Sequence, residues 1–202
     1  MAKKQEYGNE SIKSLKGAER VRKRPAVIFG SDGIEGCEHS IFEIMSNSID
    51  EAREGYGKKI IITKYLDGSV EVQDFGRGIP VDYNKNEGKF NWELLFCEMY
   101  AGGKYDNGGD NYEFSLGLNG LGLCATQYAS EYMDAEIKSG GYKYTLHFEH
   151  GENVGGLVKE EYKKRGDTGT RIKWKPDLKV FTDINIPCLL YTSPSPRDRT
   201  RS

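Results

Sequence analysis

Apolar residues recur every three or four positions in several parts of the chain, which is the pattern of amphipathic helices. The longest such stretch covers residues 37–53. Its apolar positions are Ile41, Ile44, Met45, Ile49 and Ala52. Shorter helices are predicted over residues 15–24, 91–100 and 121–130.

Other stretches alternate apolar and polar residues or are rich in β-branched and aromatic residues, as strands are. Residues 59–66 and 69–73 form a predicted hairpin, because Asp67-Gly68 between them is a two-residue turn signal. Further predicted strands cover residues 132–138, 142–149 and 168–175. This order of elements predicts an α+β fold, an α/β sandwich with helices on one face of a mixed, mostly antiparallel sheet.

Four segments fall outside this pattern. Residues 1–14 are polar and predict an arm, and residues 101–118, rich in Gly, Asn and Asp, predict a functional lid. The mixed charges of residues 158–167 are interpreted as a solvated hairpin. Residues 188–202 resemble a translated sequencing adaptor and are excluded from the folded domain, expected over residues 15–187. The alternative for that tail is a genuine Pro/Ser/Arg-rich basic arm.

Composition argues against several classes of protein. A net charge of −2 in 202 residues does not fit a basic nucleic-acid-binding surface spread over the whole chain. The four cysteines include no C-x-x-C pair, so free thiols are expected and zinc is not. His39, His147 and His150 lack metal-ligand spacing and are interpreted as ordinary surface or core residues. Because no stretch approaches the ~18 apolar residues of a membrane span, we expect a cytoplasmic protein without membrane contact.

The first candidate site lies on the helix predicted over residues 37–53. Glu43 and Asn47 are four residues apart and project from one face, and Asp50 follows on that same face. Partial desolvation beside the apolar stripe makes a carboxylate a better general base. An amide oxygen suits Mg²⁺. The alternative is an ordinary solvated helix face.

The second candidate site begins at Asp74, where the chain leaves the predicted hairpin. A carboxylate there can accept a hydrogen bond from an exocyclic amine such as that of adenine. Glycines that let backbone approach a flat ring, and an apolar wall, follow it: Gly76, Gly78, Ile79 and Pro80. Thr170, which begins a later strand, is placed to share the adenine or an ordered water. The alternatives are a plain glycine turn and the β-propensity of threonine.

The third candidate site is the glycine loop before the predicted helix at residues 121–130. Its members are Gly117, Leu118, Asn119, Gly120, Leu121 and Gly122. Backbone N–H groups at a helix N-terminus bind phosphate, and Gly102-Gly103-Lys104 adds a second glycine pair with a cation. Neither a Walker A loop nor a Rossmann fingerprint is present. Taken in this order, the three sites indicate an ATP site.

These residues resemble the N-terminal ATPase region of the B subunits of bacterial type IIA topoisomerases, DNA gyrase and topoisomerase IV, from about Tyr7 to Pro187. The supporting stretches are Asn47-Ser48-Ile49-Asp50-Glu51-Ala52, Gln73-Asp74-Phe75-Gly76-Arg77-Gly78-Ile79-Pro80 and Ala101-Gly102-Gly103-Lys104-Tyr105. The resemblance implies a Bergerat-type (GHKL) sandwich. It also implies an enzyme that binds ATP and Mg²⁺ and hydrolyses ATP to drive DNA strand passage, as supercoiling or decatenation.

The resemblance also implies a role for each candidate residue. Glu43 is expected to be the general base, Asn47 the Mg²⁺ ligand, and Asp74 the adenine reader, with Thr170 in support. The other implied nucleotide contacts are Tyr7, Asp50, Gly76, Gly78, Ile79, Pro80, Gly102, Gly103, Lys104, Gly117, Leu118, Asn119, Gly120, Leu121 and Gly122.

The implied partners are a second copy of the chain, a topoisomerase A-type subunit and DNA. Tyr7 and Ile12 resemble an arm that reaches across a homodimer formed on ATP binding, with the tyrosine on the partner's nucleotide. Arg77 is expected to pair with Glu51 beneath the adenine. In the family, a lysine of the following transducer domain contacts the γ-phosphate, and it would lie beyond Pro187. A fragment without that cation is expected to bind ATP weakly and hydrolyse it poorly.

Two other functions remain open at this point. A nucleotide-dependent dimerisation module with little turnover differs from the enzyme in whether Glu43→Ala abolishes phosphate release while sparing ATP binding. A histidine kinase domain predicts a phospho-accepting helix upstream of Glu43, and residues 1–36 contain no histidine. The chain departs from the topoisomerase pattern at Asn119, where a histidine is usual, but it keeps the base, the metal ligand and the adenine reader.

Overall fold

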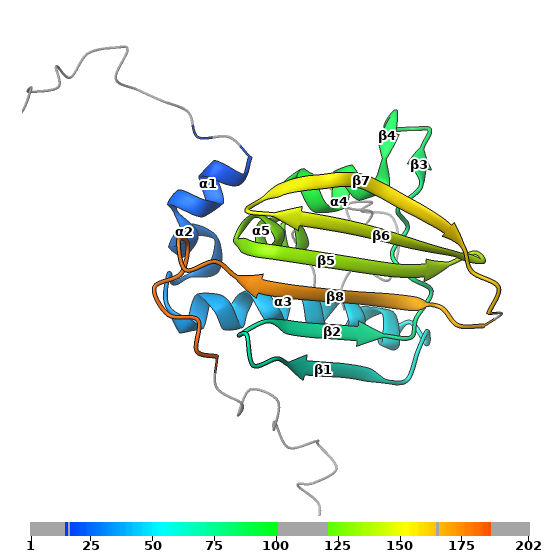
Figure 1. Ribbon diagram of the computed structural model, residues 1–202, viewed down its shortest axis with the longest axis horizontal. Helices are drawn as coiled ribbons and strands as arrows, with labels where there is room; N and C mark the ends of the chain where they lie inside the picture. The colour runs from blue at the N-terminus through cyan, green and yellow to red at the C-terminus, as the bar shows by residue number, and fades with distance from the viewer. Residues whose placement is uncertain (1–14, 16, 101–120, 165, 187–202) are drawn as a thin grey trace, which may run out of the picture.

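Six strands form one antiparallel sheet with helices on one of its faces (Figure 1). The computed structural model describes residue 15 and residues 17–100, 121–164 and 166–186. The helices are α1 (Ala18–Lys23), α2 (Pro25–Phe29), α3 (Ile34–Arg53), α4 (Asn91–Cys97) and α5 (Gly122–Tyr128). The strands are β1 (Ile60–Lys64), β2 (Val70–Asp74), β3 (Tyr83–Asn84), β4 (Lys89–Phe90), β5 (Ser130–Ser139), β6 (Tyr142–Glu149), β7 (Glu152–Glu161) and β8 (Gly169–Pro176).

The order of strands in the sheet is β1-β2-β8-β5-β6-β7. β1 and β2 form the expected hairpin, with Ile60 opposite Asp74. The predicted two-residue turn is wrong, because Lys64 lies opposite Val70 and the Tyr65 N–H donates to the Ser69 carbonyl, which leaves Leu66, Asp67 and Gly68 in the loop. β8, the last strand in sequence, lies between β2 and β5 and pairs with both. Residues near position 170 are therefore brought beside the end of β2, about a hundred residues earlier in the chain.

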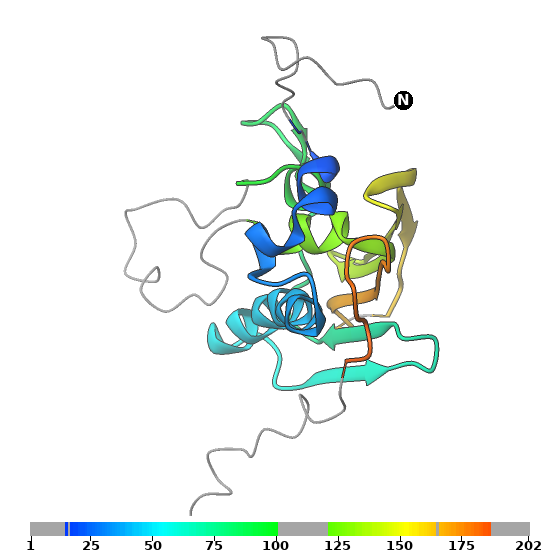
Figure 2. The same cartoon turned by 90° about the vertical axis from the view of Figure 1, so that its left-hand side faces the viewer.

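The two faces of the sheet differ because side chains alternate along each strand. On β8 the buried residues are Thr170, Ile172, Trp174 and Pro176, and the residues between them are the cations Arg171, Lys173 and Lys175. The buried face packs against α3 and α5 (Figure 2). Large side chains such as Trp174 and Met133 are fully buried there, and each stabilises the fold by roughly 1.5–3 kcal/mol. The predicted sandwich, with helices on one face of an antiparallel sheet, is confirmed.

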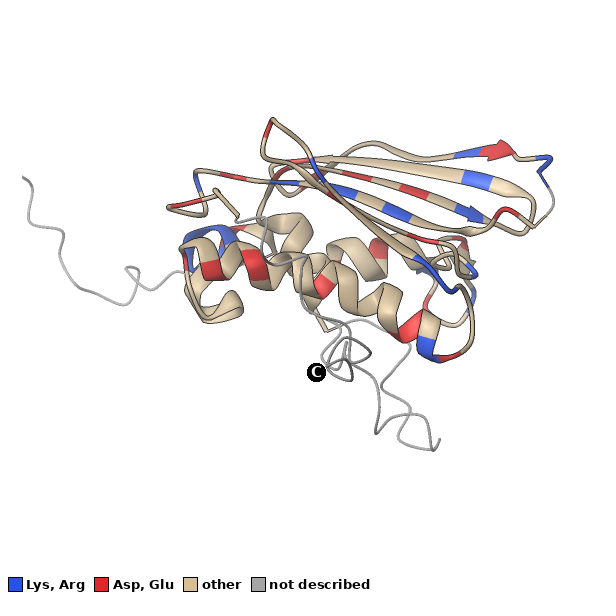
Figure 3. Ribbon diagram, turned by 90° about the horizontal axis from the view of Figure 1, so that it is seen from below, with Lys and Arg blue, Asp and Glu red and all other residues tan. Residues whose placement is uncertain are grey.

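Basic and acidic residues both occur on the strands of the sheet (Figure 3). Arg171 lies 3.4 Å from a carboxylate oxygen of Glu71 and 3.1 Å from one of Glu136. Lys175 lies 3.0 Å from Glu131. Because cations and carboxylates pair along this face, it presents mixed charge and no extended basic surface.

The prediction of a solvated hairpin over residues 158–167 is wrong at its beginning, because β7 continues to Glu161 and pairs with β6. β7 is an edge strand, and charged side chains on an edge discourage pairing with other molecules. Its register shifts near the Gly155-Gly156 pair, which also breaks the alternation that sequence patterns rely on. The sequence pattern therefore hid a ten-residue strand.

Several helix bounds also differ from the predicted ones. α3 begins at Ile34, three residues earlier than expected, and α4 ends at Cys97 because Glu98 is extended. Residues 25–29, recognised only as a short apolar segment, form the separate helix α2 with Pro25 in its first turn.

A buried ion pair joins α1 to the chain that leaves β8. Arg22 donates to Asp177 at 2.5 Å and to the main-chain oxygens of Tyr128 and Ser130. His150 contacts the same Asp177 carboxylate oxygen at 2.8 Å. Burial alone would raise the pKa of Asp177, but the bonds from Arg22, the Lys179 N–H and His150 outweigh it and lower that pKa. The ion pair fixes three separate segments to one carboxylate.

Candidate functional site

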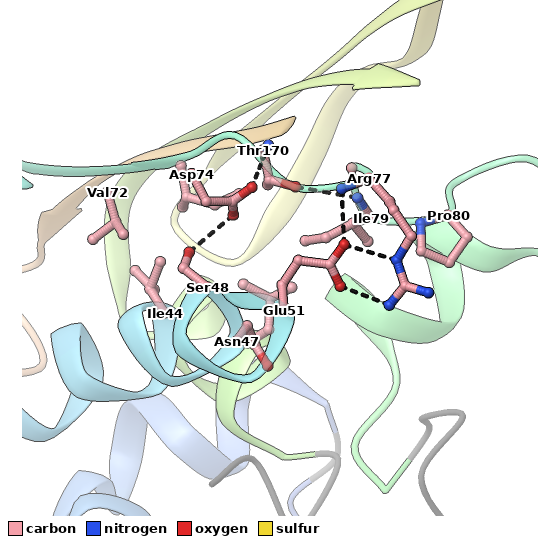
Figure 4. A pocket seen from close by; sticks show the side chains of 13 residues that line it. Ile44, Asn47, Ser48, Glu51, Val72, Asp74, Arg77, Ile79, Pro80 and Thr170 are labelled. Atoms are coloured by element: carbon pink, nitrogen blue, oxygen red, sulfur yellow. Dashed lines mark hydrogen bonds and ion pairs between the residues drawn. The ribbon is translucent and has the colours of Figure 1, made fainter. Parts of the chain in front are cut away.

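A cavity of about 430 Å³ opens between α3 and the buried face of the sheet (Figure 4). It is lined from α3, β2, the segment after β2, α5 and β8. The lining residues are Ile44, Asn47, Ser48, Glu51, Val72, Asp74, Arg77, Gly78, Ile79, Pro80, Leu123, Thr170 and Ile172. Its size and its largely apolar wall with a few converging polar groups are typical of small-molecule sites.

Asp74 is the most firmly held polar group of this cavity. The residue is only 8% exposed, at the end of β2. One carboxylate oxygen accepts a hydrogen bond from the Ser48 hydroxyl at 2.9 Å. The other accepts from the main-chain N–H groups of Gly76 at 3.0 Å and Thr170 at 3.1 Å. A carboxylate has about four acceptor positions, so Asp74 keeps room for one more donor, such as an amine of a ligand.

The segment after Asp74 follows the sheet closely because two of its residues lack side chains. A Cβ at Gly76 would lie 2.3 Å from Cγ of Glu51, and Gly78 has a φ of 83° beside the Lys138 carbonyl. The Thr170 hydroxyl accepts a hydrogen bond from the Ile79 N–H at 3.1 Å. The two glycines are therefore required by contacts within the protein, and they hold Ile79 at the cavity wall.

Arg77 lies at the rim of the cavity and forms the predicted pair with Glu51, which is confirmed. Its main-chain N–H and its Nε both donate to one Glu51 oxygen at 2.8 Å, and Nη2 donates to the other at 2.8 Å. Glu54 contacts the same Nη2, and the Tyr56 ring lies 3.7 Å from the guanidinium carbon. The hydrogen bonds that Arg77 donates to Glu51, followed by the one to Glu54, raise the pKa of Arg77 against the opposing effect of burial.

Glu43 lies on α3 outside the cavity lining, against the first residue of α5. A Cβ on Gly122 would be 1.9 Å from a Glu43 carboxylate oxygen, so only glycine leaves this space free. His39, one helical turn earlier, contacts the other oxygen through Nε2 at 3.1 Å. The Nδ1 of His39 lies 3.2 Å from the Phe29 carbonyl oxygen, so both ring nitrogens have a polar neighbour. His39 therefore orients Glu43, a role that its four-residue spacing from Glu43 could have indicated.

Asn47 lines the cavity between Glu43 and Ser48. Its Nδ2 donates to the Glu43 carbonyl at 3.2 Å, so its amide oxygen is the atom left to face a cation. In the part of the chain that the structure describes, no group of three or more His, Cys, Asp or Glu side chains could hold a metal ion. A single amide oxygen fits Mg²⁺, because that ion takes most of its ligands from water and phosphate.

Asp50 is not brought to the cavity. It is 7% exposed, and it is absent from the cavity lining. A helix turns by about 100° per residue, so Glu43 and Asp50 point together, about 40–60° from Asn47. The residues of α3 that line the cavity are centred on the other side of Asn47: Ile44, Asn47, Ser48 and Glu51. Taking Glu43 as the centre of the face led to Asp50 and missed Ser48.

Several predicted contacts lie outside the described residues. These are Tyr7, Ile12, Gly102, Gly103, Lys104, Gly117, Leu118, Asn119 and Gly120. Of the third candidate site, the structure describes Leu121 and Gly122, which lead into α5.

The described cysteines are free thiols, as expected. Burial raises the pKa of Cys37 and of Cys124 to about 12, and that of Cys97 to about 11. These thiols are therefore protonated near neutral pH.

A two-layer fold with this cavity between a long helix and an antiparallel sheet defines an ATPase domain of the GHKL class. The family described as "Histidine kinase-, DNA gyrase B-, and HSP90-like ATPase" matches residues 33–180, and the chain belongs to it. Membership of this ATPase family implies ATP binding.

Individual relatives narrow the resemblance to one group of proteins within this family. The B subunit of Thermotoga maritima DNA gyrase is 40% identical over 182 residues, which cover 90% of this chain and 28% of the relative. The B subunit of Staphylococcus aureus DNA topoisomerase 4 is 40% identical over 193 residues, which cover 94% of this chain and 28% of the relative. The chain thus spans about 28% of the length of these curated relatives. The predicted resemblance to the B subunits of type IIA topoisomerases is confirmed.

Solved structures of the ATPase domains of topoisomerase IV and gyrase B also resemble this chain. The topoisomerase IV ATP-binding domain of Francisella tularensis, in complex with a small-molecule inhibitor, has a TM-score of 0.69 and 34% identity, and the match covers 84% of this chain and 44% of that one. The 43K ATPase domain of Thermus thermophilus gyrase B, in complex with an aminocoumarin, has a TM-score of 0.66 and 32% identity, over 85% of this chain and 42% of that one. Among the described residues, no helix is long and apolar enough to cross a membrane.

Proposed function

We propose that residues 15–187 are the ATP-binding and ATP-hydrolysing domain of a type IIA topoisomerase B subunit. The observation that carries the proposal is Asp74, a buried carboxylate held by three donors in a largely apolar cavity. The identity of 40% to the B subunits of gyrase and topoisomerase IV supports it and favours this function over a histidine kinase domain. Residues 188–202 are proposed to lie outside the natural domain.

The cavity binds the adenine of ATP. The exocyclic amine of adenine donates to the remaining acceptor position of Asp74, and the ring lies between Ile44 on α3 and Ile79 with Pro80. The Thr170 hydroxyl accepts a hydrogen bond from the Ile79 N–H, and the Thr170 N–H donates to Asp74. These two hydrogen bonds keep the two sides of the cavity at a fixed separation. Nucleotides without an amine at this position lose the hydrogen bond and leave Asp74 short of a donor.

Glu43 serves as the general base of hydrolysis. It takes a proton from the attacking water while the oxygen of that water bonds to the γ-phosphorus. The bond between that phosphorus and the bridging oxygen breaks, and ADP leaves with the electron pair. His39 holds the Glu43 carboxylate in place for this step. Asn47 would hold Mg²⁺, which when bound neutralises charge on the phosphates.

The phosphates are enclosed by segments that are mostly outside the described residues. We assign this to Gly102, Gly103, Lys104 and residues 117–122, because glycine N–H groups and a lysine bind phosphate. Tyr7 and the rest of the arm over residues 1–14 join two copies of the chain when ATP binds. The full protein acts with an A-type subunit on DNA in the cytoplasm, and hydrolysis resets a gate for strand passage. A cation from the longer protein completes the site, so this chain alone hydrolyses ATP poorly.

Calorimetric titration of the 202-residue chain with ATP and Mg²⁺ tests the proposal, together with the variant Glu43→Gln. We expect weak ATP binding with equal affinity in both proteins. In single-turnover experiments with protein in excess, we expect phosphate release to fall by about 10²-fold or more in the variant. Glu35→Gln makes the same change at an exposed position of α3 and should leave both measurements unchanged.

Each outcome separates the candidate functions. A chain that binds no ATP would contradict the proposal as a whole. ATP binding without any Glu43-dependent phosphate release would favour a nucleotide-dependent dimerisation module. Steady-state turnover by this chain at a gyrase-like rate would refute the requirement for a further cation. An assay of whether the full complex supercoils or decatenates DNA distinguishes gyrase from topoisomerase IV.

A further inference from the structure

The aromatic ring of Tyr56 covers one side of the Arg77 guanidinium. Tyr56 follows the end of α3, where its main-chain N–H donates to the Glu51 carbonyl at 3.0 Å. The guanidinium carbon of Arg77 lies 3.7 Å from the centre of the ring, well within the range of a cation–π contact. This contact fixes the tilt of the guanidinium plane. The hydrogen bonds to the carboxylates alone do not fix that tilt.

The charged partners of Arg77 fix its direction within that plane. Glu51 accepts from Nε and Nη2 with both of its oxygens, and Glu54 accepts from Nη2 as well. Two carboxylates on one guanidinium leave the group of three with a net negative charge. Arg77 is therefore poorly suited to bind the phosphates of a nucleotide, and its flat surface is what it can offer to a ligand.

Arg77 lines the cavity, whereas Tyr56 and Glu54 do not. The ring thus supports the guanidinium from outside the cavity lining. Half of the Arg77 side chain and 44% of Tyr56 remain exposed, so the pair forms a rim at the mouth of the cavity rather than part of the core. Without a support of this kind, an exposed arginine samples many rotamers and offers no fixed surface.

We propose that Tyr56 is a positioning residue for nucleotide binding, which holds the Arg77 guanidinium flat at the rim so that it contacts the planar base of the bound nucleotide. The inference rests on the proposed function, because it needs a nucleotide base in the cavity. It predicts an effect on nucleotide affinity with no effect on the hydrolysis step, since Glu43 lies outside the cavity lining.

Calorimetric titration of the full chain with ATP tests this inference with four variants. These are Tyr56→Leu, Tyr56→Phe, Arg77→Ala and the double variant Tyr56→Leu/Arg77→Ala. The Kd for ATP should rise about two- to fivefold in Tyr56→Leu, the range of an exposed cation–π contact. Tyr56→Phe keeps the ring and should bind ATP like the wild type.

The double variant distinguishes positioning from a general loss of structure. If Tyr56 acts through Arg77, then Tyr56→Leu should cause no further loss of affinity once Arg77 is alanine. The single-turnover rate at saturating ATP should be the same in wild type and Tyr56→Leu. Equal losses in both Arg77 backgrounds, or a loss in Tyr56→Phe, would overturn the inference.

Failure of the inference differs from failure of the proposed function. Wild-type affinity in Tyr56→Leu overturns the positioning role alone, because the chain still binds ATP. A wild-type chain that binds no ATP overturns the proposed function and this inference with it.

Discussion

Asp74 and Glu43 are both carboxylates beside helix α3, yet their surroundings differ. Asp74 is 8% exposed and accepts hydrogen bonds from Ser48, Gly76 and Thr170. The Glu43 side chain is 26% exposed, and among the described residues its oxygens meet one polar side chain, that of His39. The carboxylate that we propose to recognise a ligand is thus fixed from several sides, whereas the one that we propose as the general base keeps access to solvent.

The two carboxylates also depend on different kinds of structure. Asp74 is fixed by pairing between β2 and β8, which joins residues far apart in the chain. Glu43 is fixed within one helix by His39 and is confined by the absence of a side chain at Gly122. Disturbing the first should change affinity, and disturbing the second should change turnover. Three substitutions test this difference.

The largest effect is expected from Gly122→Ala. The new Cβ would occupy the position of the Glu43 carboxylate and push it aside. Because a misplacement of about 1 Å at a reacting group costs about 10²-fold in rate, single-turnover phosphate release should fall by that amount. The Kd for ATP should change less than the rate, because alanine keeps the main-chain N–H through which residue 122 is proposed to bind phosphate. Gly140→Ala, at an open turn with nothing within 4 Å of the new Cβ, is the control for an added methyl group away from Glu43, and an equal loss of rate there would contradict the explanation.

A smaller effect is expected from Asp74→Asn, and it should appear in affinity. The amide cannot accept from all three protein donors and also from the adenine amine. Losing one charge-assisted hydrogen bond of about 2 kcal/mol should raise the Kd for ATP by about 30-fold. Calorimetry provides the measurement. Asp67→Asn, in the exposed turn between β1 and β2, should bind ATP normally, and a comparable loss there would count against a specific role of Asp74.

The smallest effect is expected from His39→Gln. Losing one net hydrogen bond of about 1 kcal/mol that orients Glu43 should slow phosphate release about fivefold, with ATP affinity unchanged. His147→Gln is a matched control, since His147 also contacts carboxylates, Asp134 and Glu149, but on β6 away from the cavity. An unchanged rate in His39→Gln would show that Glu43 needs no partner.

The parts of the site that follow from local pattern could be predicted from the sequence. The period of α3 places Glu43 and Asn47 on neighbouring directions of one helix, and the Asp67-Gly68 turn signal indicates the hairpin whose second strand, β2, ends at Asp74. Both features depend on residues only a few positions apart. Periodicity and turn chemistry report such local structure directly.

The parts that depend on tertiary packing could not be predicted in the same way. Ser48 faces Asp74 only because α3 lies against β2 at one particular rotation. The sequence reason given for Gly76 and Gly78 was approach to a ligand, whereas the structure requires them for Glu51 and the Lys138 carbonyl. No sequence motif pointed to Tyr56, because its proposed role depends on its position over the Arg77 guanidinium.

The Asp177 carboxylate has a mechanical consequence. It holds Arg22 of α1 and His150 of the β6–β7 turn, directly after β8 ends. A pull on the chain before α1 is therefore transmitted through Arg22 to Asp177 at the end of β8. The lowered pKa of Asp177 means that this contact adds stability above the ordinary aspartate pKa and loses it as the pH falls through the lower, folded value. The contacts of Asp177 with Arg22 and His150 therefore stabilise the domain less in acid than at neutral pH.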